Sequence, residues 1–320
     1  MGVNRRLEVI AAERGGWFTR PDAHAAGYSD SELRQRVRSG QWLRVSFNSY
    51  VDPHDWPTHE PPWERAVRLH LLNVRMAGAR LRDVVVSHQS ATLLHGLPVW
   101  GTDLTKAHFT RVASGRARSG RGIRLHRSTS PIIEDEVVEF GGLRVTCVDR
   151  AVVETTCTTS YEVGVVLADA ALRMRLTTGD RLAGVVRRHR RWHGSPAAAA
   201  AALFAKALSE SVGESRLRVL MANQGLPTPE LQVEIRGADG RLIGRVDFLL
   251  EGVLVVEFDG AMKYGDGADA VLAEKWREDR LRELGYGVLR ISWADLDHPQ
   301  ETAARIWRAL RRHAAESGNR

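Results

Sequence analysis

In the stretch VDFLLEGVLVVEFDG, residues 246–260 near the C-terminus, three carboxylates stand among the aliphatic residues on either side of the turn at Glu251-Gly252. Burying an unpaired carboxylate costs free energy, so Asp247, Glu257 and Asp259 either face water or gather around a positive charge. Side chains alternate along a strand, which places Glu257 and Asp259 on one face. Magnesium prefers carboxylate oxygens and water as ligands. The stretch therefore predicts a Mg²⁺ or Mn²⁺ site formed by Asp247, Glu257 and Asp259.

A β-hairpin must position these acids. We expect its strands at residues 241–250 and 253–264. An odd-length loop centred on Gly252 would place Asp247 opposite Glu257, whereas a two-residue loop would turn Asp247 to the other face. The sequence leaves both registers open.

The helix before the hairpin carries a further acid, Glu214, on the same helical face as Leu217 and Met221. Its carboxylate can therefore point toward the sheet. Lys263, just after the hairpin, could contact a phosphate or position a water molecule. A carboxylate-bound Mg²⁺ can activate water and stabilise the charge on a phosphate under attack. The predicted catalytic residues for phosphodiester hydrolysis are Glu214, Asp247, Glu257 and Lys263.

The N-terminal residues have the rhythm of a winged helix-turn-helix. Residues 3–13 are expected to form a helix, and Thr19 can cap a second one. Ser29, followed three residues later by Glu32, is a capping-box signal for a third. Strand-like residues then follow at 42–51.

The third predicted helix and the following strand carry several arginines. A recognition helix uses cationic and polar side chains to meet phosphates and base edges. The ribbon also contributes Asn48, which could reach an adjacent groove or the backbone. The alternative is an ordinary solvated helix face, and the later basic run at residues 187–191 reads as a solvated helix end. The predicted DNA-binding residues are Arg34, Arg36, Arg38 and Arg44.

Composition sets the domain count. The chain has 320 residues, 43% of them hydrophobic and 27% charged, with a net charge of +7. At roughly 100–200 residues per domain, we expect a winged helix at 1–52, a mixed α/β domain at 63–195 and an α/β sheet domain at 196–320. The fold class is therefore α+β or mixed α/β. The basic charge is compatible with a nucleic-acid partner.

The remaining metal-binding residue types carry a weaker signal. Histidines of the middle region stand at irregular spacings on different elements, so we expect them to pack or face solvent: His88, His95, His108 and His126. Cys147 and Cys157 lack metal-ligand spacing and favour a reducing cytoplasm. We expect neither a signal peptide nor a membrane-spanning helix.

The order of Glu214, VDF and VVEFDG resembles the PD-(D/E)XK nuclease superfamily, over about residues 208–313. The run EKWREDRLRELGYGVLRISWADL is similar to the end of the very-short-patch-repair endonuclease. This resemblance implies a restriction-endonuclease-like fold with Mg²⁺ held by acids. The sequence departs from the family pattern at two places. Asp259 stands where the family has a lysine, and Lys263 or Lys275 would replace that lysine. Phe258-Asp259 stands where the repair enzyme has Thr-His, so the T·G mismatch activity of that enzyme is not carried over.

The N-terminal stretch GGWFTRPDAHAAGYSDSELRQRVRSGQWLRV resembles the winged helix of AbiEi-type antitoxins. VVSHQSATLLHGL and RVTCVDRAVVE resemble the region after it, so the similarity covers about residues 1–190. That family implies promoter DNA as a ligand and a toxin as a protein partner. Two functions follow as expectations. The first is a protein that binds double-stranded DNA and carries a Mg²⁺-dependent endonuclease domain; the alternative is an antitoxin-like transcriptional regulator with an inactive nuclease fold.

Overall fold

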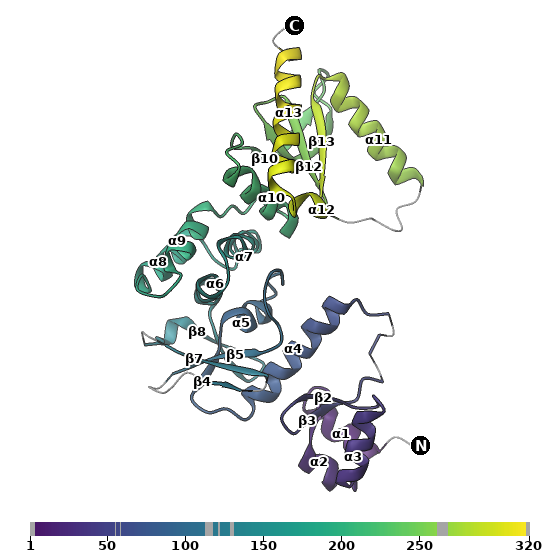
Figure 1. The fold of residues 1–320 in the computed structure, drawn as a ribbon, viewed down its shortest axis with the longest axis vertical. Coiled ribbons are helices and arrows are strands. Elements are labelled where there is room, and N and C mark those ends of the chain that lie inside the picture. Colours follow the sequence, from purple (N-terminus) through teal and green to yellow (C-terminus); the bar gives the residue numbers. More distant parts are fainter. Residues whose placement is uncertain are drawn as a thin grey trace. The chain divides into compact units, whose positions relative to one another are not determined.

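The computed structural model describes residues 4–54, 56–57, 59–112, 118–120, 122–128, 131–260 and 268–317 (Figure 1). The chain forms two compact units. The first joins Met1–Thr159 to Gly184–Pro196, and the second joins Ser160–Ala183 to Ala197–Arg320. The expected boundary near residue 195 is therefore crossed by the segment 160–183, which groups with the C-terminal part. No helix in the described part of the chain is long and apolar enough to cross a membrane.

The first unit begins with three helices and a small sheet in the order expected for a winged helix. Its elements are α1 (Arg5–Glu13), β1 (Phe18–Thr19), α2 (Arg20–Ala25), α3 (Asp30–Arg38), β2 (Leu43–Ser46) and β3 (Ser49–Val51). The sheet order is β1-β3-β2. Capping boxes start α2 at Thr19 and α3 at Ser29, as the sequence predicts. Phe18 and Trp42 meet edge-to-face at 4.8 Å in the core.

Helix α4 (Pro62–Gly78) supports the back of this winged helix. Its Leu72 and Met76 share a buried cluster with Trp17 and Val51. Just after α4, Arg80 donates hydrogen bonds to two residues of the β2–β3 hairpin: to the Phe47 carbonyl at 2.6 Å and to Ser46 Oγ at 3.1 Å. The wing is thereby fixed to the helix.

A mixed six-stranded sheet follows, as expected for a mixed α/β region, in the order β6-β7-β5-β4-β9-β8. Its strands are β4 (Val84–Val86), β5 (Ala107–Arg111), β6 (Arg118–Gly120), β7 (Ile123–Arg127), β8 (Val137–Phe140) and β9 (Leu143–Thr146). The helical elements beside it are α5 (His88–Leu94), the short 3₁₀ helix η1 (Glu134–Glu136) and α6 (Val148–Thr158). Pairing is parallel for β5–β7 and β4–β9 and antiparallel for β4–β5. This order brings the ends of β5 and β7 beside the start of α5.

The second unit contains α7 (Tyr161–Arg173), α9 (Ser195–Phe204) and α10 (Val212–Asn223), and α8 (Gly179–Arg188) spans its border with the first unit. Asp169 on α7 ties the segment together: its carboxylate accepts from Arg218 Nη2 at 2.7 Å, from Ser215 Oγ at 2.8 Å and from the Lys206 backbone amide at 2.7 Å. This buried ion pair explains why α7 groups with the C-terminal part. The alanine-rich helix α9 ends at Phe204, and Ser211 caps a separate helix, α10.

The C-terminal sheet has the order β10-β11-β12-β13. Its elements are β10 (Glu230–Arg236), β11 (Leu242–Leu250), β12 (Leu254–Asp259), α11 (Ala268–Glu283), β13 (Gly287–Ser292), α12 (Trp293–Leu296) and α13 (Pro299–Ser317). The first three strands pair antiparallel, and β13 joins β12 in parallel after α11. Helices α10 and α13 pack on one face and α11 on the other (Figure 1).

One close approach fixes α10 against β12. A Cβ atom added to Gly213 would lie 1.8 Å from the Phe258 ring, so this position accepts no side chain. Because Glu214 is the next residue along α10, the same approach holds its carboxylate near the sheet.

Candidate functional sites

The predicted acidic residues lie where β11 and β12 stop pairing. The register joins Leu250 to Leu254 and Phe248 to Val256, around a three-residue loop. One step further it sets Asp247 across from Glu257, which is the odd-loop alternative. There the ladder ends, and Asp247 Oδ2 instead accepts a hydrogen bond from the Phe258 backbone amide at 2.9 Å.

Glu214 approaches the same place from α10. It is 7% exposed, and its Oε2 accepts from the Gln232 amide at 3.0 Å and from the Glu210 backbone amide at 2.9 Å. Gln232 adopts a left-handed backbone with φ of 52° in the middle of β10. Its amide also lowers the pKa of Asp247. Gln232, which the sequence analysis missed, thus links the two acids.

Burial and repulsion act on both carboxyls. Burial raises the pKa of Glu214, and the nearby charge of Asp247 raises it further, despite the Glu210 amide. Burial likewise raises the pKa of Asp247, against the lowering effects of the Phe258 amide, Gln232 and Arg277. Raised pKa values mean that the ionised carboxylates destabilise the folded protein here, so a nearby cation would stabilise it.

Arg277 supplies one such cation. This α11 residue donates through Nη2 to Glu257 Oε1 at 2.6 Å, and both side chains are largely buried. Its charge also lowers the pKa of Asp247. The sequence analysis missed Arg277 because α11 follows β12 at a separation that no motif predicts.

The other residues expected at this site lie differently. Asp259 is exposed at the last position of β12, beside Ser292 in the sheet. Lys275 is exposed on α11. Lys263 lies outside the described residues. Asp247 and Glu257 supply the carboxylate oxygens that a hard divalent cation prefers, and with the exposed Asp259 they would be its ligands. Among the described residues, however, these acids do not bring three ligand atoms close enough to hold a metal ion; only the histidines described below do so.

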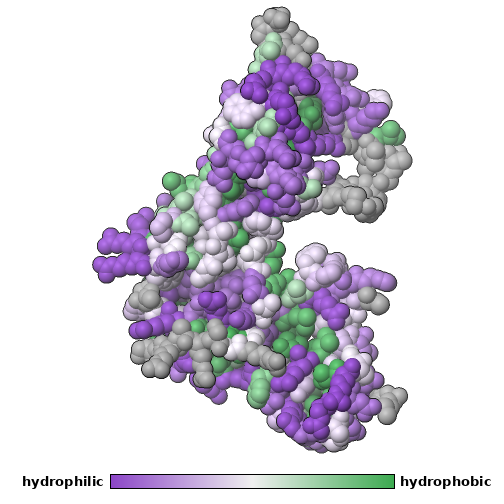
Figure 2. Space-filling view, in the orientation of Figure 1, coloured by the Kyte–Doolittle hydropathy of each residue, from purple (hydrophilic) through white to green (hydrophobic). Residues whose placement is uncertain are grey.

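The winged helix presents part of the predicted basic surface. Arg34 and Arg38 are exposed one turn apart on α3, and Arg44 is exposed on β2. Strongly hydrophilic side chains stand out on the surface over α3 (Figure 2). These residues can meet a polyanion without rearrangement.

Arg36 differs from its neighbours on α3. Its guanidinium lies 4.9 Å from the Tyr28 ring and 5.0 Å from the Trp42 ring, and it donates to Gln41 at 3.2 Å. Arg36 was predicted to bind DNA beside Arg34 and Arg38, but it is half-buried, whereas those two are exposed. On a helix, positions 34 and 38 align, whereas position 36 points to the opposite side.

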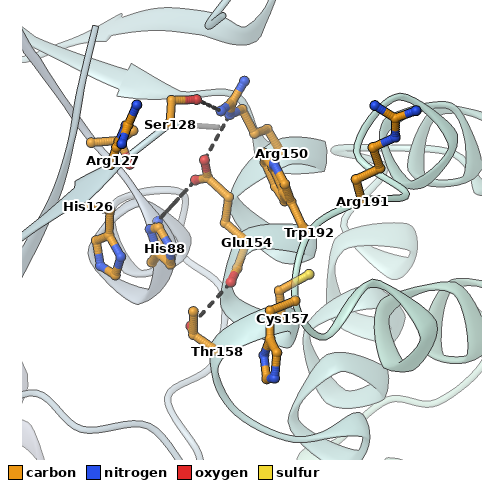
Figure 3. Close-up of a pocket in the computed structure, with 12 residues that line it drawn as sticks. His88, His126, Arg127, Ser128, Arg150, Glu154, Cys157, Thr158, Arg191 and Trp192 are labelled. Atoms are coloured by element: carbon orange, nitrogen blue, oxygen red, sulfur yellow. Dashed lines mark hydrogen bonds and ion pairs between the residues drawn. The ribbon is translucent and has the colours of Figure 1, made fainter. Parts of the chain in front are cut away.

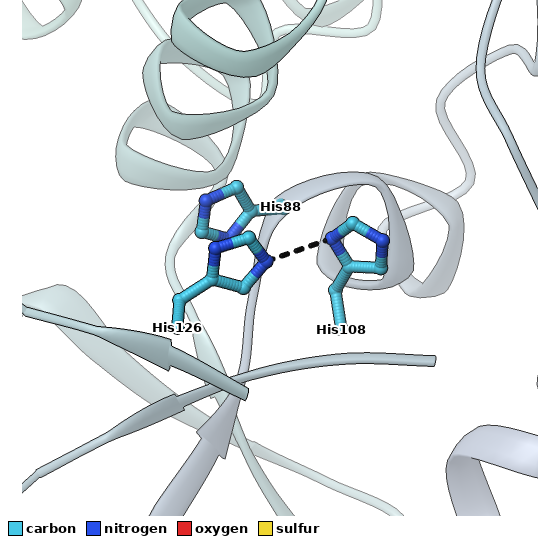
Figure 4. Close-up of side chains that lie close together, drawn as sticks. All are labelled: His88, His108 and His126. Atoms are coloured by element: carbon cyan, nitrogen blue, oxygen red, sulfur yellow. Dashed lines mark hydrogen bonds between the residues drawn. The ribbon is translucent and has the colours of Figure 1, made fainter. Parts of the chain in front are cut away.

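Three histidines of the middle region, which were expected to pack or to face solvent, pack against one another. One ring nitrogen from each of His88, His108 and His126 lies within 4.8 Å of the others (Figure 4). In the described part of the chain, only this group brings three metal-ligand side chains so close. The sheet order places His108 on β5 beside His126 on β7, with His88 at the start of α5.

Hydrogen bonds decide what these histidines do in this structure. His126 Nε2 lies 2.9 Å from His108 Nδ1, and the Gln89 amide lies 3.0 Å from His108 Nε2. Gln89 Nε2 can only donate, so His108 carries its proton on Nδ1 and donates it to His126. His88 stacks on His126 at 3.6 Å. The facing nitrogens are thus engaged with each other rather than aimed at an ion.

Burial keeps these imidazoles neutral. It lowers the pKa of His108 to about 3 and that of His126 to about 4, and it lowers the pKa of His88 well below its ordinary value. At neutral pH the cluster therefore carries no charge.

A buried ion-pair network adjoins the histidines. Arg150 on α6 is fully buried and donates to Glu154 at 2.8 Å, to Ser128 Oγ at 3.2 Å and to Glu136. Figure 3 shows Glu154 between His88 and Arg150. The i,i+4 spacing of Arg150 and Glu154 was a signal that the sequence analysis could have used.

The two acids of this network respond in opposite directions. Burial alone would raise the pKa of Glu136, but hydrogen bonds from His189 and Arg188 and the charge of Arg150 bring it down to about 2. At Glu154 burial outweighs the charge and hydrogen bond of Arg150, so its pKa is raised. The two pKa values differ because Glu136 contacts three cationic or hydrogen-bonding side chains, those of Arg150, Arg188 and His189.

Comparison with known proteins bears on the N-terminal part. Residues 5–46 match the family described as transcriptional regulator, AbiEi antitoxin. This match covers the three helices and β2, so the chain has an AbiEi antitoxin-like regulator domain at its N-terminus.

Relatives of similar length exist in Mycobacterium tuberculosis. The uncharacterized proteins MT2308 (strain CDC 1551 / Oshkosh) and Rv2248 (strain ATCC 25618 / H37Rv) are each 29% identical over 283 residues, covering 88% of this chain and 97% of theirs. The crystal structure of the RV2827C protein from the same organism aligns over 62% of this chain and 76% of that chain, with a TM-score of 0.40 and 14% identity.

Proposed function

We propose that this protein is a DNA-binding transcriptional regulator of the AbiEi antitoxin type, with α3 as its recognition helix. The observation that carries the proposal is the pairing of Arg34 and Arg38 on the exposed face of α3, within the residues that match the family. Side chains one helical turn apart can contact phosphates and base edges of one major groove. Arg44 on the wing would reach the adjacent backbone. We include a toxin as a possible protein partner only because the matching family is described as an antitoxin.

DNA footprinting on the duplex upstream of the protein's own coding sequence tests the proposal. We expect a protected site of one or two helical turns, and repression of a reporter placed behind it. Arg34→Ala combined with Arg38→Ala should remove both effects, while Arg5→Ala combined with Arg6→Ala, on α1, should leave them. Protection that persists in the α3 variant would place the DNA surface elsewhere.

A second function, metal-dependent phosphodiester hydrolysis, is favoured by one specific observation. Asp247 and Glu257 are the residues next to the last pair of β11 and β12, Phe248 and Val256, and Glu214 is close enough to Asp247 for the charge of Asp247 to raise the pKa of Glu214. When bound there, Mg²⁺ would supply charge to activate water and neutralise a phosphate. Asp247 and Glu257 would bind it, and Glu214 would orient the water. Lys263 is the cation expected at the scissile phosphate, and the target would be double-stranded DNA.

Plasmid nicking in Mg²⁺ or Mn²⁺, against a chelator control, tests this second function. Asp247→Asn and Glu257→Gln should each abolish nicking while leaving duplex binding unchanged, because metal ligands stabilise the transition state more than the bound ground state. Glu251→Gln, in the hairpin turn, is the matched control. Nicking at the wild-type rate by Asp247→Asn would exclude the site.

A further inference from the structure

A pocket of about 210 Å³ lies in the first unit and takes no part in the functions proposed above. Its lining residues come from α5, β5, β7, α6 and the basic run after α8 (Figure 3). The run at residues 187–191, read from the sequence as a solvated helix end, therefore contributes Arg191 to the wall of this pocket.

The positive charges of the lining are not all balanced. Arg150 is neutralised by Glu136 and Glu154, its two buried partners. Arg127 and Arg191 are exposed, and no carboxylate of the described residues pairs with either. They lie on the two sides of Arg150 in Figure 3. Two uncompensated guanidinium groups thus flank one cavity.

The lining offers an anion little repulsion, because its one carboxylate is already paired with an arginine. Glu154 is the one carboxylate in the lining, and it already accepts from Arg150 at 2.8 Å. The imidazoles of His88 and His126 form part of the wall and are held in place by stacking. The hydroxyl groups of Thr110 and Thr158 complete a polar surface.

We propose that this pocket binds a small organic phosphate, with Arg127 on one side of the pocket and Arg191 on the other supplying the positive charge that holds it. Planar guanidinium groups match phosphate oxygens bidentately, which a chloride ion cannot exploit. The cavity is larger than a phosphate group alone but smaller than the roughly 300–1,000 Å³ typical for drug-sized ligands. A phosphate monoester with a compact organic group fills such a space. The site would give the regulator a small-molecule ligand distinct from DNA.

Calorimetric titration of the full-length, chelator-treated protein tests the proposal. The probes are ribose 5-phosphate, inorganic phosphate and chloride at equal ionic strength. We expect saturable binding of both phosphates, with the ester bound more tightly, and none of chloride. Arg127→Gln and Arg191→Gln should each weaken binding about tenfold or more. Arg124→Gln on the same strand as Arg127, and Arg187→Gln in the same run as Arg191, should bind like wild type.

Three results would overturn the proposal. Binding that is unchanged in Arg127→Gln and Arg191→Gln would show that neither arginine contacts the phosphate. If inorganic phosphate binds as tightly as the ester, the pocket does not recognise the organic part of the ligand, and the proposal of a phosphate ester is wrong. The third result has two parts: the wild type retains one zinc ion per protein that His108→Ala loses, and the zinc-free protein binds no phosphate. That outcome would make the histidine cluster a metal site instead. Melting curves of each variant confirm that it is folded.

Discussion

Arg277 on α11 donates a hydrogen bond of 2.6 Å to Glu257 on β12, across from Asp247. An arginine therefore neutralises the carboxylate that the proposed metal would need. The positive charge of Arg277 opposes binding of a second cation at Glu257, so metal and arginine compete for this carboxylate.

From this competition we predict that Arg277→Gln increases the rise in melting temperature caused by Mg²⁺ or Mn²⁺. A ligand that binds only the folded state stabilises it by about 2.7 kcal/mol at a hundredfold excess over its dissociation constant. Arg280→Gln, on the exposed side of the same helix, controls for charge. An equal rise in all three proteins would indicate ionic screening rather than a site.

The acids at the opening of the ladder should make stability depend on pH. Burial raises the folded-state pKa of Glu214 and Asp247. Their favourable contribution is therefore complete below the unfolded-state pKa and is lost as pH rises through the folded-state value. We predict that Asp247→Asn stabilises the metal-free protein at pH 7 to 8, relative to wild type, and that this gain disappears toward pH 4. Urea melts across that range measure it, and a gain independent of pH would contradict the prediction.

Arg36 should behave as a packing residue. It stacks on Tyr28 and Trp42, and an arginine over aromatic rings contributes about 0.5–1 kcal/mol at partly exposed sites. We predict that Arg36→Ala lowers the free energy of unfolding by about that amount and leaves the salt dependence of DNA binding unchanged. Chemical denaturation and binding titrations check the two parts. A change in salt dependence as large as that of Arg34→Ala would assign Arg36 to the DNA surface.

The buried network around Arg150 should dominate the stability of the middle region. Removing one partner of a buried ion pair typically costs about 3–5 kcal/mol, so Arg150→Leu should destabilise the protein by about that amount at pH 7. In the wild type, the depressed pKa of Glu136 contributes stability that is present above pH 4.5 and lost as pH falls toward about 2. Acid titration of unfolding measures this window. Glu136→Gln should show a flatter acid limb, and an unchanged limb would contradict the assignment.

Local signals predicted the N-terminal part well. The capping boxes at Thr19 and Ser29 involve side chains three residues apart, so sequence alone predicts where α2 and α3 begin. The hairpin of β11 and β12 was likewise predicted from neighbouring residues. Its register was not, because it depended on whether the loop had two or three residues. Glu214 was predicted to face the sheet because Leu217 and Met221 share its side of α10, and all three are buried.

Features assembled from distant segments could not be predicted in the same way. The histidine cluster depends on the strand order β7-β5-β4, which no residue spacing reveals. Strand β10 was missed because it lies at the edge of its sheet, where six of its seven residues are not buried and alternation is weak. Gln232 and Arg277 reach the acidic residues only through the pairing of β10 with β11 and the packing of α11.

The salt dependence of duplex binding tests the central claim most directly. Each phosphate contact releases condensed counterions, so the logarithm of affinity falls with the logarithm of salt concentration by about 0.9 per contact. We predict that Arg34→Ala combined with Arg38→Ala reduces this slope by about two relative to wild type. An unchanged slope in a folded variant would contradict the assignment of α3 as the DNA-binding helix.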